Sequence, residues 1–150
     1  MYYKVGNGSY STSIPQASAV GSYTIYYYAA ASTNYTQSAE GSLTATIVKA
    51  AGSVSTAPTN RAAAYTGGNV NLVNAGSGTG TMYYRLNSGS WGTSIPVASA
   101  VGSYTVYYYA AASTNYNQSA TGSLTATIVK ASGSVSTAPT NRGVTYNGGN

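Results

Sequence analysis

The chain has 150 residues, of which six are lysine or arginine and only one, Glu40, is acidic. It contains no cysteine and no histidine, which excludes disulfide bonds and thiol chemistry and removes the commonest metal ligands and catalytic bases. With 17 tyrosines, 18 glycines and a hydrophobic fraction of 43%, the composition is typical of a folded all-β protein whose surface is polar but uncharged.

The basic residues are scattered singly along the chain, at Lys4, Lys49, Arg61, Arg85, Lys130 and Arg142. Nucleic-acid-binding proteins usually cluster such residues on one face or helix, so a net charge of +5 spread in this way predicts no nucleic-acid partner. No run of apolar residues is long enough to cross a bilayer, so we expect no membrane span in this segment.

The sequence repeats itself with an offset of 81 residues. Residues 1–69 align without a gap on residues 82–150, and 54 of the 69 pairs are identical. Most differences are mild, such as Lys4 against Arg85, and only residues 70–81 have no second copy. Because solenoid repeats have periods of roughly 20–50 residues, this longer period predicts that each unit is a domain.

Two matching junctions place the boundaries of the repeat: "IVKAAGSVSTAPTNR" at 47–61 and "IVKASGSVSTAPTNR" at 128–142. Small residues and glycine after a β-rich run are typical of a domain junction. We therefore expect residues 1–51 to be the C-terminal part of one repeat (the first unit), 53–131 to be a complete repeat (the second unit), and 134–150 to be the N-terminal strands of the next. The chain is thus expected to be a window on a longer array.

Strand signals follow one another through the second unit. The stretch "AAAYTGGNVNLV" (62–73) predicts a strand, a Gly-Gly turn and another strand, and "TMYYRLNSGSW" (81–91) predicts a strand that leads into a hairpin at 87–89. The stretches "GSYTVYYYAAAS" (102–113) and "GSLTATIVKA" (122–131) predict two long strands joined by a loop. No stretch has sustained helical periodicity, so an all-β fold is expected.

Alternate residues of a strand point to opposite faces of its sheet, which divides the tyrosine-rich strands into two sets. The faces that contain Met82, Val106 and Leu124 are the better core candidates. Six tyrosines are then expected to point outward: Tyr2, Tyr26, Tyr28, Tyr83, Tyr107 and Tyr109. Two interpretations are open, because these tyrosines either stabilise the sheet as cross-strand pairs or form an aromatic contact surface for a neighbouring subunit or a glycan.

The string "AVGSYTV" (100–106) resembles the start of strand F in an immunoglobulin-type sandwich. In this resemblance Tyr104, with Tyr23 in the first unit, is the structural tyrosine corner, and Val106 stands where antibody domains have their second disulfide cysteine. The whole second unit is similar to the bacterial immunoglobulin-like repeats called MBG, found in tandem on large bacterial surface proteins and in some phage virion proteins. The resemblance implies a tandem array of immunoglobulin-like β-sandwiches that is extracellular, on a bacterial cell surface or a virion surface.

The residues needed for catalysis or cofactor binding are missing. A hydroxyl nucleophile needs a base, yet the chain has no histidine, and its one acid, Glu40, is replaced by Thr121 in the second unit. The glycine-rich stretch "AGSGTGT" (75–81) lacks the Lys-Ser/Thr ending of a phosphate-binding loop. We expect no enzymatic activity, no catalytic residue, no metal site and no cofactor.

Only residues 131–133 connect the last strand of the second unit to the segment that follows it. So short a connection predicts that neighbouring repeats of the chain stack as a semi-rigid rod, the body of an extracellular fibre, stalk or surface coat. Two alternatives are an adhesion module that binds a carbohydrate or receptor with its tyrosine face, and a phage virion decoration or fibre domain.

Residues 134–150 match the kind of opening segment that the first unit lacks. One copy's tail would then complete the first unit of another copy by strand addition, giving a head-to-tail filament. The other interpretation, which we favour at this point, is that the chain is a fragment of a long repeat protein. The oligomeric state of the chain separates the two.

Overall fold

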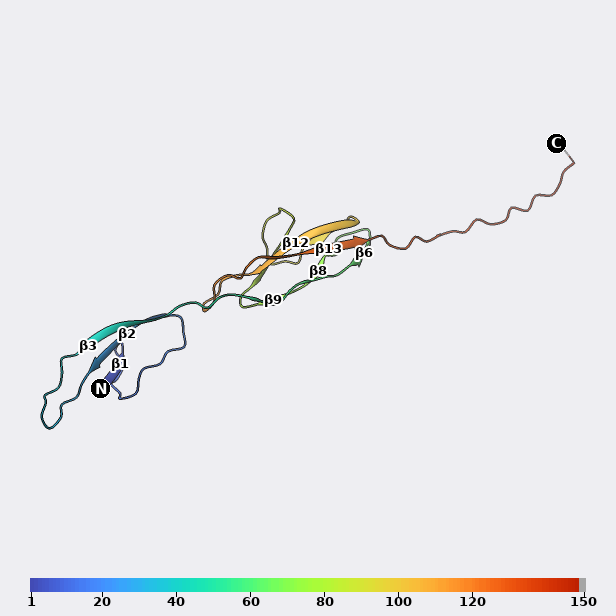
Figure 1. Ribbon diagram of the computed structural model, residues 1–150. Helices are drawn as coiled ribbons and strands as arrows, with labels where there is room; N and C mark the ends of the chain where they lie inside the picture. Colours follow the sequence, from blue (N-terminus) through green and yellow to red (C-terminus); the bar gives the residue numbers. More distant parts are fainter. Residues whose placement is uncertain (149–150) are drawn as a thin grey trace.

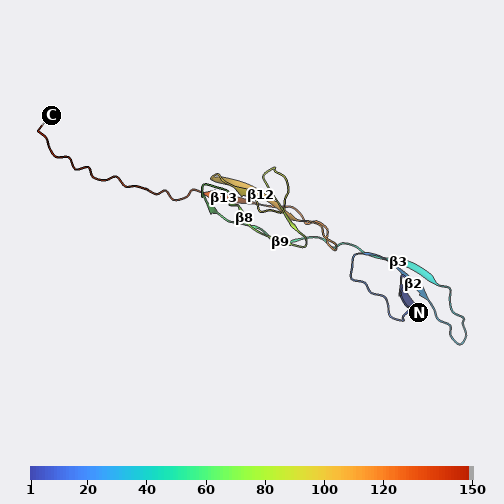
Figure 2. The same cartoon turned by 180° about the vertical axis from the view of Figure 1, so that it is seen from behind.

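The computed structural model describes residues 1–148, and every regular element within them is a strand, so the all-β prediction is confirmed. Three regions follow one another along an elongated molecule: a small sheet at the N-terminal end, a larger β unit in the middle and an extended segment toward the C-terminus (Figure 1). The view from behind gives the same order (Figure 2).

The first unit contains one antiparallel sheet of three strands in the order β1-β2-β3. Its members are β1 (Tyr2–Val5), β2 (Gly21–Tyr28) and β3 (Gly41–Ile47). Tyr2 pairs with Tyr28, and Ile25 pairs with Leu43. Because β3 has no strand on its far side, it is an edge strand.

The second unit contains a four-stranded sheet in the order β10-β12-β13-β6. Its strands are β10 (Met82–Leu86), β12 (Gly102–Ala110), β13 (Gly122–Val129) and β6 (Ala63–Ala64). The first three pair as β1, β2 and β3 do, with partners numbered 81 higher, such as Tyr83 with Tyr109 and Val106 with Leu124. The fourth strand, β6, lies parallel to β13. The two sheets therefore share one register and differ in whether their last strand is covered.

Six short strands form a second layer in this unit. They are β4 (Val54–Thr56), β5 (Thr59–Asn60), β7 (Val70–Asn71), β8 (Val73–Asn74), β9 (Ser77–Gly78) and β11 (Val97–Ala98). Antiparallel pairs join β4 to β9, β5 to β8 and β11 to β7. Because β7, β8 and β9 follow one another directly, they act as one interrupted strand with β4 and β5 on one side and β11 on the other. The strands predicted within 62–73 are thus present but short.

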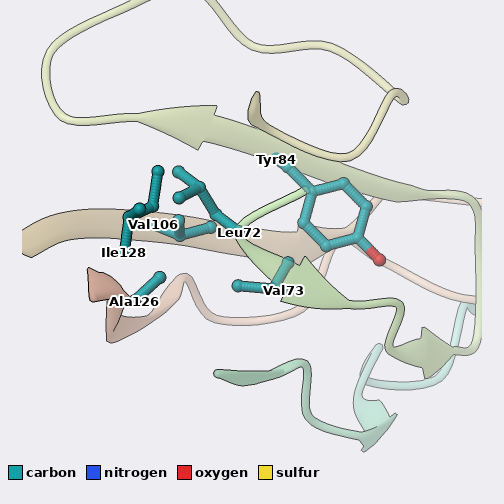
Figure 3. Packing of buried hydrophobic residues seen from close by; sticks show 6 residues of the cluster. All are labelled: Leu72, Val73, Tyr84, Val106, Ala126 and Ile128. Atoms are coloured by element: carbon teal, nitrogen blue, oxygen red, sulfur yellow. The ribbon is translucent and has the colours of Figure 1, made fainter. Parts of the chain in front are cut away.

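The core of the second unit lies between its two layers (Figure 3). Leu72 and Val73 from the short-strand layer pack against Val106, Ala126 and Ile128 of the long-strand sheet, and all five are at most 2% exposed. Tyr84 completes the buried cluster, and Met82, Leu86, Tyr104 and Leu124 pack around it half-buried. The core faces predicted from strand alternation are therefore confirmed.

The chain crosses from one layer to the other between β5 and β6. Asn60 fixes this crossing, because its side-chain oxygen accepts hydrogen bonds from the backbone N–H groups of Ala62 (2.9 Å) and Thr127 (3.1 Å). Ala62 itself has a φ of 46°, in the left-handed region that alanine adopts only at a cost. The tail has glycine at the equivalent position, Gly143.

The predicted hairpin after β10 is confirmed. Gly89 N–H donates to the Leu86 carbonyl (2.8 Å), and Tyr84 and Gly92 then exchange backbone hydrogen bonds across the turn. Asn87 has a φ of 50°, as does Gly6 at the equivalent position of the first unit. Glycine and asparagine are the residues that tolerate this conformation best, which explains why the two copies differ there without changing the turn.

The segment predicted to provide N-terminal strands of another repeat, 134–150, forms no strand over its described part, 134–148. In the second unit the equivalents β4 and β5 pair with β9 and β8, which lie in the one stretch that has no second copy, 70–81. In this structure the described part of the segment pairs with no strand, and its side chains are exposed.

Candidate functional site

The outward face of the first sheet carries an aromatic cluster built around one cation. The rings of Tyr2 and Tyr28 stack with centroids 5.3 Å apart, and Tyr10 meets Tyr28 edge-on at 4.7 Å. Lys4 Nζ lies 4.6 Å from the centre of the Tyr10 ring and 4.8 Å from that of Tyr26. We call these four tyrosines and Lys4 the first aromatic cluster. Strand alternation places Tyr2 and Lys4 on one face, and the register of β2 brings Tyr26 and Tyr28 beside them.

The same arrangement recurs in the second unit as the second aromatic cluster. Tyr83 and Tyr109 stack at 5.4 Å, and Trp91 meets Tyr109 edge-on at 4.7 Å. The guanidinium of Arg85 lies 4.8 Å from the centre of the Trp91 ring and 4.6 Å from that of Tyr107. Stacked and edge-to-face ring pairs and a cation over a ring each contribute about 0.5–1 kcal/mol at such partly exposed sites.

The first aromatic cluster includes an ion pair between Lys4 and Glu40, and the second unit has no acid at the position of Glu40. Glu40 lies 3.6 Å from Lys4 Nζ and accepts a hydrogen bond from the Tyr10 hydroxyl. Partial desolvation lowers the pKa of Lys4, but its interactions with Tyr10 and Glu40 outweigh this effect and raise the pKa above its ordinary value. Desolvation and the hydrogen bond to Glu40 raise the pKa of Tyr10. The second unit has Thr121 in place of Glu40, so no carboxylate stands at the equivalent position beside Arg85.

The six tyrosines predicted to point outward thus gather in two groups of three, one on each sheet. Tyr10, Trp91 and the two cations complete the clusters but were not predicted as part of this surface. Alternation places Lys4 and Arg85 on the tyrosine face, so strand period was a usable signal for them. Tyr10 and Trp91 lie in loops, where no period applies, and only their shared aromatic character hinted at a role.

Every member of the two clusters is half-buried, because each ring covers part of its neighbour. The rings are therefore neither core residues nor fully free binding platforms. Together the two aromatic clusters form a surface of packed rings with one cation in each copy, which we call the aromatic ridge. Such a surface offers contact area and hydrogen-bonding hydroxyls.

The proposed tyrosine-corner residues make equivalent hydrogen bonds. The Tyr104 hydroxyl donates to the carbonyl of Ala100 at 2.7 Å, and the Tyr23 hydroxyl donates to the carbonyl of Ala19 at 2.7 Å. A tyrosine bonded to the backbone a few residues upstream ties the loop before the strand to the strand itself. Neither tyrosine is among the rings of the two aromatic clusters.

The segment that connects the two units is hydrogen-bonded to the second unit. Ala50 N–H donates to the Asn115 carbonyl (2.9 Å), and Asn117 N–H donates to the Ala50 carbonyl (2.8 Å). Lys49 Nζ also donates to the Ser113 carbonyl (2.8 Å). The connection is therefore a short strand-like segment on the loop between β12 and β13, rather than a free linker.

Gly52 makes this docking possible. A Cβ atom at Gly52 would overlap the carbonyl oxygen of Asn117, so only glycine lets the two backbones approach so closely. Gly133 stands at the equivalent position after the second unit and has open space around it. Gly52 and Gly133 thus hold equivalent sequence positions, but only Gly52 packs against another backbone segment.

The inner face of the first sheet is open. A hollow of about 200 Å³ is lined there by side chains that include Val5, Tyr23, Ile25, Ala45 and Ile47. Their equivalents in the second unit pack against Leu72 and Val73. The hollow therefore lies where the short-strand layer covers the second unit.

Comparison of the chain with family models, with curated proteins and with solved structures found no match. Residues 1–148 contain no helix that is long and apolar enough to cross a membrane. The same residues bring together no group of three or more metal-ligating side chains.

Proposed function

We propose that this chain is a non-enzymatic structural segment made of immunoglobulin-like β-sandwich repeats with an 81-residue period. The strand order of the second unit supports the proposal. One sheet would contain immunoglobulin strands A, B and E. Strand A corresponds to β4 and β5, strand B to β7, β8 and β9, and strand E to β11. The strands β10, β12 and β13 correspond to C, F and G of the other.

The repeats are proposed to stack as the body of a semi-rigid extracellular fibre, stalk or coat, on a bacterial cell or a virion. The resemblance to MBG-type repeats supports the location. The charge-poor surface supports close packing of many copies, because copies with few charges repel one another weakly. A mechanical role needs no catalytic or cofactor site.

The observation that carries this proposal is the docked connection at residues 49–52. Two backbone hydrogen bonds and the Lys49 contact resist bending between the units. Nitrogen-15 relaxation of the dilute chain tests the stiffness directly. We expect residues of β2 and β12 to report one shared rotational correlation time along an elongated axis.

The matched variants are Gly52→Ala and Gly133→Ala. Gly52→Ala should separate the correlation times of the two units, because the added methyl group displaces the connection from Asn117. Gly133→Ala should leave them unchanged, since its position has open space. Independent tumbling of the units in the unmodified chain would refute a rod.

A second candidate function is recognition of a carbohydrate or receptor by the aromatic ridge. The recurrence of the same cluster of rings and cation 81 residues apart favours it, since repeated aromatic surfaces suit multivalent binding. A glycan array with the unmodified chain and with the Tyr107→Ala, Tyr109→Ala variant tests it. Binding that the variant loses supports recognition, and no binding to any glycan supports the structural role alone.

A further inference from the structure

Within residues 1–148, two segments form fewer strand pairs than their equivalents in the second unit do. In the second unit β13 is bordered by β6, whereas β3, the equivalent strand of the first unit, is an edge. Along and beyond this edge Leu43 is 49% exposed and Val48 is 79% exposed. An edge strand of this kind is a template for another extended segment.

The tail from 134 to 148 is an extended segment of matching sequence. Val135, Val144 and Tyr146 are 79%, 86% and 86% exposed, which is unusual for valine and tyrosine. Residues 133–142 are identical to residues 52–61, which cover the second unit. The tail therefore has the sequence of a covering segment, and its described part, 134–148, pairs with no strand in this structure.

The second unit shows how such a segment is held. Residues 49–52 dock on the loop between β12 and β13, Asn60 bonds the backbone and side chain of Thr127, and β6 runs parallel to the end of β13. Tyr65 N–H then donates to the Val129 carbonyl at 2.9 Å. The segment thus contacts the long-strand sheet at both ends of the unit.

We propose that the tail of one copy binds the first unit of a second copy in this same register, so that the chain assembles head to tail. Ala131 would pair with the loop at Asn34 and Thr36, Asn141 would bond Thr46, and Val144 would lie beside Ile47. The inference deepens the proposed function by naming the partner, and it rests on the immunoglobulin-like unit proposed there.

The acceptor groups needed for this register are present in the first unit. The template uses backbone atoms of the β12–β13 loop, and the equivalent loop keeps the same internal hydrogen bond, from Ser32 N–H to the Tyr35 carbonyl at 2.9 Å. Thr46 keeps the hydroxyl that Thr127 uses. At the crossing position the tail has Gly143 where the template strains Ala62, so the tail adopts the docked backbone at lower cost.

Sedimentation velocity of the 150-residue chain at rising concentration tests the assembly. We expect the unmodified chain to form dimers and larger species, and Gly133→Ala to weaken association by roughly tenfold or more, since losing the two backbone bonds of Ala131 costs about that much. Gly133→Ala leaves the monomer intact because nothing lies near that position. The control Ser132→Ala, which copies Ala51 of the template, should assemble as the unmodified chain does.

A second measurement locates the contact. Amide hydrogen exchange of Tyr146 should slow as the chain assembles, because its N–H would donate to the Val48 carbonyl. A monomer at every concentration overturns this inference, and so does Gly133→Ala assembling like the unmodified chain, as contact through the aromatic clusters would predict. A monomer whose two units still share one correlation time leaves the proposed function standing, so the two failures are distinguishable.

Discussion

The two units have nearly the same long strands and very different interiors. Val106 and Ile128 of the second unit are 0% and 2% exposed, whereas Ile25 and Ile47 at the equivalent positions are only half-buried. The registers are the same, and each outer face carries a stacked tyrosine pair with one cation beside it. What differs is the short-strand layer, which covers the inner face of the second unit alone.

This difference separates what a strand determines by itself from what its neighbours determine. Alternation and register set which side chains share a face, so the stacked tyrosines and the cation take equivalent positions in both units. Burial of the inner face requires a second layer, and Leu72 and Val73 supply it. A sheet of this kind therefore buries its inner face only when a covering layer lies over its long strands.

The largest expected effect comes from truncating the same residue type in the two environments. Ile128→Ala should destabilise the second unit by about 2–5 kcal/mol, because it removes buried methyl groups and leaves a cavity. Ile47→Ala should cost the first unit only about 1 kcal/mol, because its side chain is already half in water. Urea denaturation followed by Trp91, the one tryptophan, reports the second unit. The methyl resonances of Ile25 report the first. Equal costs would contradict the difference in burial.

The second prediction concerns the covering segment itself. Asn60→Ala should destabilise the second unit by about 1–3 kcal/mol, because up to three hydrogen bonds at the layer crossing are lost and the Thr127 N–H loses its partner. Asn141→Ala, the equivalent change in the tail, should leave the dilute monomer unchanged. Trp91 fluorescence in urea measures both. A loss of stability for Asn141→Ala in the monomer would mean that the tail folds back onto its own chain.

Much of this comparison could be predicted from sequence, because it depends on local periodicity. The outward tyrosines and the core face around Val106 follow from the period of two, and the hairpin at 87–89 follows from its turn residues. Each is set within a few residues of chain. The all-β class follows from composition in the same way.

The rest depends on contacts between distant residues, which a single sequence does not display. Tyr10 joins the first aromatic cluster from a loop, and its bond to Glu40 spans thirty positions. The hydrogen bond from Lys49 to the Ser113 carbonyl joins the connecting segment to a loop 64 residues further along the chain. The strands predicted in the tail also depend on distant partners, since in the second unit β4 and β5 pair with β9 and β8.

A smaller effect is expected at Tyr104 and Tyr23, whose hydroxyls each bond the backbone four residues upstream. Tyr104→Phe removes the hydrogen bond to Ala100 and should cost the second unit about 1 kcal/mol. Tyr23→Phe removes the equivalent bond and should cost the first unit no more, because that side chain lines an open hollow where water replaces its partner. The Trp91 and Ile25 signals used above separate the two. A greater loss in the first unit than in the second would show that the hollow is closed in solution.

The smallest effect is a difference between the units in alkali. The pKa values of Lys4 and Tyr10 are both raised, so the folded first unit holds its protons more tightly than the unfolded chain does. This contribution to stability is complete below the ordinary pKa values, near pH 10, and is lost as the pH rises through the raised ones.

The second unit has Arg85, Trp91 and Thr121 at these positions, so it lacks this cause of lost stability in alkali. The midpoint of thermal unfolding should therefore fall more steeply above about pH 10 for the Ile25 methyl signal than for that of Ile128. The double change Tyr10→Trp, Glu40→Thr, which copies the second unit, should bring the two slopes together. If the unfolding midpoint of the first unit still falls as steeply in this variant, other groups cause its loss of stability in alkali. The ion pair at Lys4 would then not explain the difference between the two units.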